Sequence, residues 1–304
     1  MRLRALLLSS LIVPCALVAA GCGAEEKPEL GDLVGSSLRA AAGQKDLKVH
    51  YAVTAKVDAT PSALASEQTR KFLSDPISLS ASGGASKDAV TLAGQVGFLG
   101  KSYRAEALVG QTETYVNLLG SWYGDRTQGL STAKQSAEDK AGSKADPEEL
   151  KKTLRWVYDH SDEVLDAEVT AGPDIDGATW QAKGHCKADA LVDLAKRSGE
   201  TVSAEDRKGI ESFCGLAEVT YVVGAEDHLP RQLRIAVDLD KQTLTQLGAA
   251  SDDDSAKELD RLSMELDIKL TQWGKDVTYK APANAKPMED IGMALMGLMF
   301  TAMS

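Results

Sequence analysis

Residues 264–271 alternate strictly between apolar and polar side chains, with Met264, Leu266, Ile268 and Leu270 separated by Glu265, Asp267, Lys269 and Thr271. A repeat of two residues is that of a β-strand, whose successive side chains point to opposite faces of a sheet. Similar runs recur along the chain, at residues 48–58, 77–81, 90–98, 103–109, 179–185, 219–223 and 233–239. The sequence therefore predicts about eight to eleven strands, most of them with one apolar and one polar face.

Turn residues separate several of these runs at hairpin-like spacing, namely Gly83–Gly84, Gly100 and Gly110. The strands are therefore expected to form an antiparallel meander. The helical segments are too few to cover such a long sheet, so the apolar faces must meet each other or a helix. We predict an α+β fold in which a curled antiparallel sheet forms a half-open β-barrel covered by helices.

The interior of such a sheet either fills with side chains or leaves a ligand cavity. Small residues at inward positions favour a cavity: Ala55, Ala81, Gly94, Ala105 and Ala107. The residues predicted to line it are apolar residues at alternating strand positions: Val53, Val57, Leu92, Val96, Leu233, Ile235, Val237, Leu266 and Ile268.

Several segments have helical rather than strand patterns. Residues 30–44 have apolar side chains at helical spacing and close at Gly43, which predicts a short amphipathic helix. A helix is expected to begin at Asp146, where an N-cap Asp is followed by Pro at the first helical position and by acidic residues. A helical turn near Glu67–Phe72 and two helices at Asp189–Arg197 and Ser203–Phe213 complete the set.

The N-terminus has the pattern of a secretory signal. Arg2 and Arg4 precede an apolar run that is too short to be a comfortable membrane span, and small residues lead into Cys22. The ending Leu17–Val18–Ala19–Ala20–Gly21–Cys22 resembles a bacterial lipobox, in which the signal is cut before the cysteine and the thiol carries a diacylglycerol. The resemblance implies lipid attachment at Cys22 and a place on the extracytoplasmic face of the cell membrane. The alternative is an ordinary signal peptide cut nearby, with Cys22 incidental.

Two cysteines remain if Cys15 leaves with the signal and Cys22 is lipidated. In an exported protein this even pair, Cys186 and Cys214, is most simply a disulfide. The bond would fasten a helical insert, residues 187–214, to the sheet. Zinc binding is the alternative, but His185 beside Cys186 is the only other hint of a ligand set.

The net charge of −11 and pI of about 5.0 make nucleic acid an unfavourable partner, because binding phosphate needs a basic face.

No cofactor or metal site is predicted. Residues 252–254 are three successive aspartates, read as a solvated acidic turn rather than a calcium site because the EF-hand spacing is absent. The four histidines are not in a nucleophile arrangement, and a Gly-x-Ser-x-Gly elbow is absent from the sequence, so no enzymatic activity is expected.

We divide the chain into four segments. Residues 1–21 are the signal peptide, and residues 22–45 are the anchor, tether and first helix. Residues 46–287 form the half-barrel domain with its insert. Residues 288–304 are a Met-rich C-terminal helix, which is expected either to plug the core or to act as a membrane-touching tail or a lid.

The order of these features resembles a known group of proteins. The chain is similar to actinobacterial lipoproteins of the LppX/LprG type and, more distantly, to the LolA/LolB carriers. The resemblance rests on a lipobox, a helix leading into the strand Lys48–Asp58, the glycine–aromatic segment Tyr115–Tyr123, the late hairpin Val219–Leu239 and the ending Tyr279–Pro282. The resemblance implies a LolA-like half-barrel whose cavity holds acyl chains of lipids or lipoproteins.

The leading hypothesis is a membrane-anchored protein that binds an acyl chain of a lipid or lipoprotein and transports or relays it. The alternative is a structural or signalling envelope lipoprotein that binds a protein partner and takes no small ligand.

Overall fold

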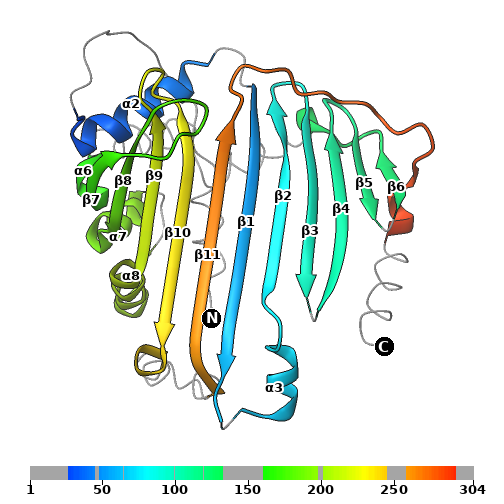
Figure 1. The fold of residues 1–304 in the computed structure, drawn as a ribbon. Coiled ribbons are helices and arrows are strands. Elements are labelled where there is room, and N and C mark those ends of the chain that lie inside the picture. Colours follow the sequence, from blue (N-terminus) through cyan, green and yellow to red (C-terminus); the bar gives the residue numbers. More distant parts are fainter. Residues whose placement is uncertain are drawn as a thin grey trace. The chain divides into compact units, whose positions relative to one another are not determined.

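Figure 1 shows the computed structural model of the chain, which describes residues 27–44, 48–63, 65–98, 100–118, 120–132, 160–197, 201–244 and 258–291. The chain divides into two compact units. Unit 1 comprises Met1–Asp46, Lys140–Gly215 and Val219–Gln232. Unit 2 comprises Leu47–Asp139, Leu216–Glu218 and Leu233–Ser304. No helix among the described residues is long and apolar enough to cross a membrane.

The strands form a single sheet with the order β12-β6-β5-β4-β3-β2-β1-β11-β10-β9-β8-β7. Their bounds are β1 Lys48–Pro61, β2 Ile77–Ser86, β3 Val90–Phe98, β4 Lys101–Val109, β5 Thr114–Leu118, β6 Ser121–Asp125, β7 Leu165–Ala171, β8 Thr179–Cys186, β9 Ala217–Gly224, β10 Pro230–Asp240, β11 Leu259–Thr271 and β12 Lys286–Pro287. Neighbours from β6 to β11 pair antiparallel, whereas β12 pairs parallel with β6. The predicted α+β class is confirmed, and the sheet is not closed, since β12 and β7 lie at its two ends.

Helix α2 precedes β1, and the other α-helices lie between strands in the chain. The helices are α2 Leu30–Ala42, α3 Glu67–Phe72, α6 Ser161–Val164, α7 Ala188–Arg197 and α8 Ala204–Leu216, and the 3-10 helix η2 Met288–Asp290 follows β12. The predicted helices at residues 30–44, 67–72, 189–197 and 203–213 are therefore confirmed to within a few residues. Most of the helix predicted from Asp146 lies outside the described residues.

The turn predicted at Gly83–Gly84 is wrong, because both residues lie inside β2. Each is a glycine because another part of the fold approaches its backbone closely. A Cβ on Gly83 would lie 1.8 Å from the Thr91 carbonyl oxygen and 2.9 Å from the Tyr51 hydroxyl. A Cβ on Gly84 would lie 2.8 Å from a Val277 methyl. The chain turns later, at Lys87–Asp88.

In unit 1, α2 packs on the sheet through one apolar face. Leu33 is 1% exposed and contacts Val169 of β7, Ala182 of β8 and Val223 of β9. One turn further along, the buried Ser37 hydroxyl forms a hydrogen bond with the Tyr221 hydroxyl of β9. The amphipathic pattern of residues 30–44 is thus explained by burial against three strands.

We expect the burial of Tyr221 to make the stability of the protein fall at high pH. Burial raises the pKa of Tyr221 from 10.0 to about 12. Since the folded pKa exceeds the unfolded one, the stabilisation is complete below pH 10 and is lost as the pH rises through about 12. Urea midpoints measured between pH 7 and pH 12 should decline over this window.

The matched variant is Tyr221→Phe, which has no hydroxyl to ionise. It should lose about 1–3 kcal/mol at neutral pH because it leaves the buried Ser37 hydroxyl without its partner. Its stability should decline less steeply above pH 10 than that of the natural protein. An equally steep decline would assign the alkaline transition to other groups.

In unit 2, residues 272–287 cross from the end of β11 to β6, as the orange segment of Figure 1 shows. We call this segment the strap. Asp276 pairs with Lys48 at 2.6 Å (Nζ to Oδ1). The Tyr279 and Tyr115 hydroxyls donate to the two carboxylate oxygens of Glu113, at 2.7 and 2.9 Å. Burial, followed by the contact with Glu113, raises the pKa of both tyrosines. The strap therefore rests on a partly buried hydrogen-bonded cluster.

Candidate functional site

The register of unit 2 aligns apolar side chains across neighbouring strands. Directly paired residues of adjacent strands point to the same face of a sheet. One row of such pairs runs across six strands, from β11 to β5: Ile268, Val53, Ala81, Gly94, Ala105 and Leu118. We call the side of the sheet that carries this row the apolar face.

The middle of this row is formed by small residues, Ala81, Gly94 and Ala105, which we call the small-residue row. A Cβ on Gly94 would lie 3.4 Å from the Ala81 Cβ, consistent with their shared face. The rows on either side contain larger apolar side chains interspersed with alanine and glycine. On one side the paired residues are Leu266, Ala55, Leu79, Val96 and Tyr103, and on the other they are Leu270, Tyr51, Gly83, Leu92, Ala107 and Val116.

Several large side chains on the apolar face are exposed. Leu79 is 40% exposed, Val96 41% and Leu92 37%. Met264, which pairs with Val57, is 36% exposed. Exposed apolar residues are unremarkable singly, but contiguous ones in register mark an interaction surface. Leu79, Val96 and Leu92 come from adjacent strands and lie on both sides of the small-residue row.

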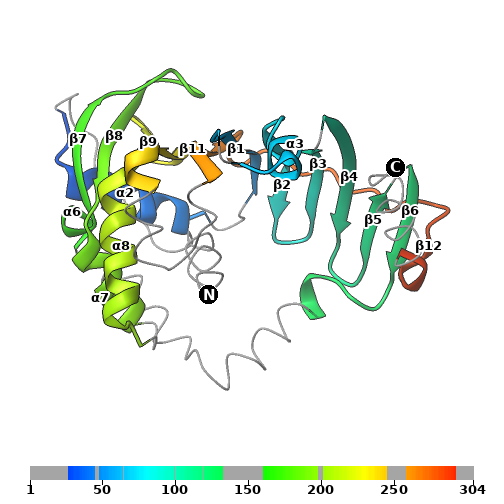
Figure 2. The same cartoon turned by 90° about the horizontal axis from the view of Figure 1, so that it is seen from below.

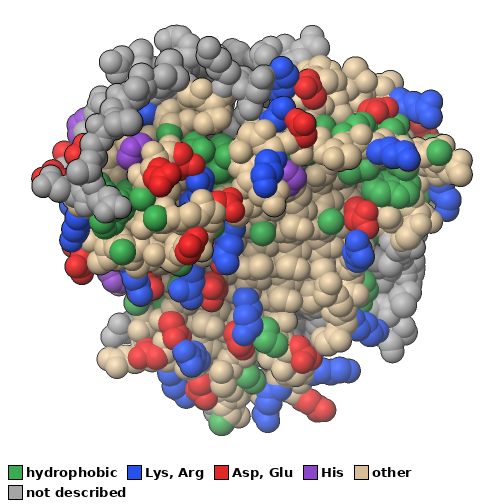
Figure 3. Space-filling view, turned by 45° about the horizontal axis from the view of Figure 1, so that its top comes forward, with side chains coloured by type: hydrophobic (Ala, Val, Ile, Leu, Met, Phe, Trp, Pro, Cys, Tyr) green, Lys and Arg blue, Asp and Glu red, His purple; other side chains and the backbone are tan. Residues whose placement is uncertain are grey.

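The opposite side of the same strands is polar. Arg234 of β10 pairs with Glu265 of β11 at 2.8 Å (Nε to Oε1), and Arg261 of β11 pairs with Asp238 of β10. Figure 3 shows Lys and Arg side chains interspersed with Asp and Glu over the face in view. Residues of the strap cover part of this polar side at Gly84 and Gly124. The two sides of the sheet therefore differ sharply in what they can bind.

The structure brings together most of the residues predicted to line a cavity. Val53, Val57, Leu92, Val96, Leu266 and Ile268 share the apolar face by register. Ile235 and Val237 of β10 pack in one cluster with Leu262 of β11, which alternation places on the same face, and Leu233 follows the same alternation along β10. That these residues line a cavity stays a prediction.

Two exposed members of the face, Leu79 and Met264, were missing from the predicted set. Both occur at alternating positions of their strands, so the period-two pattern alone would have found them. The register that places Leu79 beside Val96 has no comparable sequence signal, because it depends on which strands pair.

A polar group on the apolar face, the Tyr51 hydroxyl, is satisfied within the protein. The Tyr51 hydroxyl donates to the Thr91 carbonyl oxygen at 2.7 Å, and burial raises the pKa of Tyr51. Among the described residues, no group of three His, Cys, Asp or Glu side chains is placed to hold a metal ion. The face therefore offers a ligand chiefly apolar contact.

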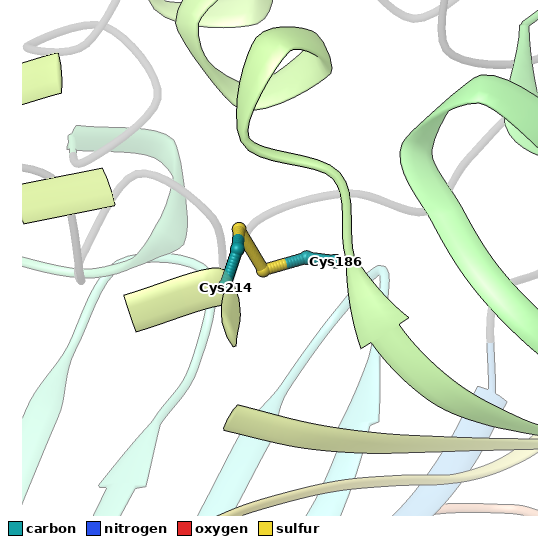
Figure 4. The surroundings of a disulfide bond; sticks show 2 residues. All are labelled: Cys186 and Cys214. Atoms are coloured by element: carbon teal, nitrogen blue, oxygen red, sulfur yellow. A yellow bond between two sulfur atoms is a disulfide. The ribbon is translucent and has the colours of Figure 1, made fainter. Parts of the chain in front are cut away.

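The predicted disulfide between Cys186 and Cys214 is present (Figure 4). It joins the end of β8 to α8 and so closes the segment that contains α7. Other predicted features lie outside the described residues: Cys22 with the signal peptide, the acidic run 252–254 and residues 292–304 of the Met-rich segment.

No protein-family model matches the chain, and no curated protein matches it. Among solved structures, the crystal structure of LprF from Mycobacterium bovis is similar to that of this chain, with 18% sequence identity and a TM-score of 0.37. The similarity covers 84% of this chain and 97% of LprF. It is too distant to carry a ligand or the role of any residue over to this chain.

Proposed function

We propose that this protein is a membrane-anchored extracytoplasmic lipoprotein that binds an acyl chain of a lipid or lipoprotein on its apolar face and transports or relays it. The observation that carries the proposal is the small-residue row between exposed Leu79 and Val96 on one side and exposed Leu92 on the other. A flexible hydrocarbon chain is the ligand that fits a narrow apolar strip flanked by larger apolar side chains.

The size of the row suits one acyl chain. From Val53 on β1 to Leu118 on β5 there are four strand spacings of about 4.8 Å, or ~19 Å in all. One leaflet of a bilayer has a hydrocarbon depth of ~15 Å, half of the ~30 Å core. The driving force is the burial of apolar surface, at roughly 25 cal/mol per Å².

In this proposal, lipid attached to Cys22 holds the protein at the membrane. Seven residues, 23–29, separate Cys22 from the first residue of α2. Fully extended, they reach about 25 Å at most, since each residue spans ~3.3–3.6 Å. Because α2 is packed against the sheet, a protein held in this way acts as a stationary relay at one membrane rather than as a shuttle between two.

The experiment that tests the proposal is native mass spectrometry of the delipidated protein mixed with candidate lipids. We expect one bound lipid per chain. Val53→Trp places a bulky side chain on β1 beside Ala81, the β2 end of the small-residue row, and should abolish loading. If delipidated protein takes up none of the lipids, or if Val53→Trp loads like the natural protein, acyl binding on this face is refuted and binding of an envelope protein becomes the better hypothesis.

A further inference from the structure

We propose that the C-terminal residues 292–304 occupy the apolar face of unit 2 when no lipid is bound, and that an arriving acyl chain displaces them. The docking of the segment is independent of the proposed function, whereas its exchange with a lipid rests on it. Three observations support the proposal: where the described chain ends, how far the remaining residues reach, and what side chains they carry.

The described chain ends beside the sheet, at the edge formed by β6. Lys286 and Pro287 of β12 pair with Tyr123 and Gly124 of β6, and Figure 2 shows β12 next to this strand. The Lys286 ammonium lies 5.6 Å from the centre of the Tyr123 ring. Tyr123 belongs to the apolar face, since it pairs with Val116 in one of the rows described above. Residues beyond Ile291 therefore start at the border of the apolar face.

The reach of the remaining residues matches the width of the exposed region. Thirteen residues follow Ile291. Even as a helix, the most compact regular form, they span ~20 Å at 1.5 Å per residue. The distance from β6 to β2 is four strand spacings, or ~19 Å. The segment is long enough to cover Leu92 and Val96 on β3 and to reach Leu79 on β2.

The side chains of the segment suit a surface that must also accept another occupant. Residues 292–304 contain no Asp, Glu, Lys or Arg, so docking removes no charged side chain from water. Large apolar side chains are frequent among them, with Met293, Leu295, Met296, Leu298, Met299, Phe300 and Met303. Methionine adapts its shape to irregular apolar surfaces. A contact made largely by methionine can fill the space over the small-residue row and still be displaced by another apolar occupant.

The first test compares the full chain with a chain that ends at Ile291, using a fluorescent long-chain fatty acid as the probe. Removing the segment should lower the Kd for the probe about tenfold, because the probe no longer competes with it. Met296→Lys keeps the length of the segment but adds a charge, and it should also lower the Kd. Urea midpoints of the variants verify that they are folded. Unchanged Kd values in both variants would overturn the proposed exchange.

The second test needs no ligand. In the delipidated full chain, the methionines at 293, 296, 299 and 303 should react slowly with hydrogen peroxide, as measured by peptide mass spectrometry, because docking shields them. Saturating fatty acid should raise their oxidation rates several-fold. Equally fast oxidation with and without the probe overturns docking, as does protection that appears only after phosphatidylglycerol vesicles are added. If these methionines are protected but no probe binds either chain, docking stands and the proposed function fails.

Discussion

Gly94→Leu is expected to lower the affinity for an acyl chain about a hundredfold. Gly94 lies in the middle of the small-residue row, where it pairs with Ala81 on β2 and Ala105 on β4. A Cβ there would lie 3.2 Å from the Ser80 carbonyl oxygen and 3.4 Å from the Ala81 Cβ, so the backbone needs only a small shift to accept it. The rest of the leucine side chain would then occupy the strip that the acyl chain needs.

The magnitude follows from the contacts that the ligand loses. Displacing three or four methylenes costs about 2.4–3.2 kcal/mol at ~0.8 kcal/mol per buried CH₂. Each ~1.4 kcal/mol is tenfold in Kd, which gives the hundredfold loss. Titration of the delipidated variant with a fluorescent fatty acid measures it.

The matched control is Ala93→Leu, one residue earlier in β3. Ala93 pairs with Ser82 and Glu106, so its side chain points to the polar side of the sheet. This variant places the same leucine side chain on the same strand and should bind the fatty acid like the natural protein. Equal losses in both variants would mean that β3 is simply perturbed, and no loss in Gly94→Leu would remove the small-residue row from the binding site.

The strands of unit 2 could be predicted from the sequence because their signal is local. The alternation at residues 264–271 and at 48–58 places each apolar side chain on one face regardless of what pairs with it. Val53, Val57, Leu266 and Ile268 were assigned to a common face in this way, and the β1–β11 register agrees with that assignment. Alternation alone determines the face but not the neighbour.

What the sequence did not predict depends on residues that are distant along the chain. Two adjacent glycines usually mark a turn, yet Gly83 and Gly84 are strand residues because Tyr51 and Val277 approach them in the folded protein. The strap over the polar side is fastened by Glu113 and Tyr279, which are 166 residues apart. Neither contact leaves a periodic pattern. The small-residue row is a similar case, since it exists only once β2, β3 and β4 pair in register.

The pairing of Cys186 with Cys214, by contrast, could be inferred from the cysteine count, and removing it should have a large effect on stability. The two residues are 28 positions apart, and Cys214 is 3% exposed. Closing a loop of this length stabilises by about 3–4 kcal/mol in the chain-entropy model, because the unfolded chain loses freedom. The double variant Cys186→Ala, Cys214→Ala should therefore lose about this much free energy of unfolding in urea.

The loss should appear first in the segment that the bond closes. Helix α7 buries only small or medium side chains, Ala190, Val192 and Ala195, so it contributes little apolar area of its own. Without the bond, backbone amides of α7 and α8 should exchange with deuterium faster than those of β1 and β11. The control is Phe213→Ala, next to Cys214 but with a side chain that is 36% exposed, which should cost much less. A double variant as stable as the natural protein would show that packing alone holds the insert.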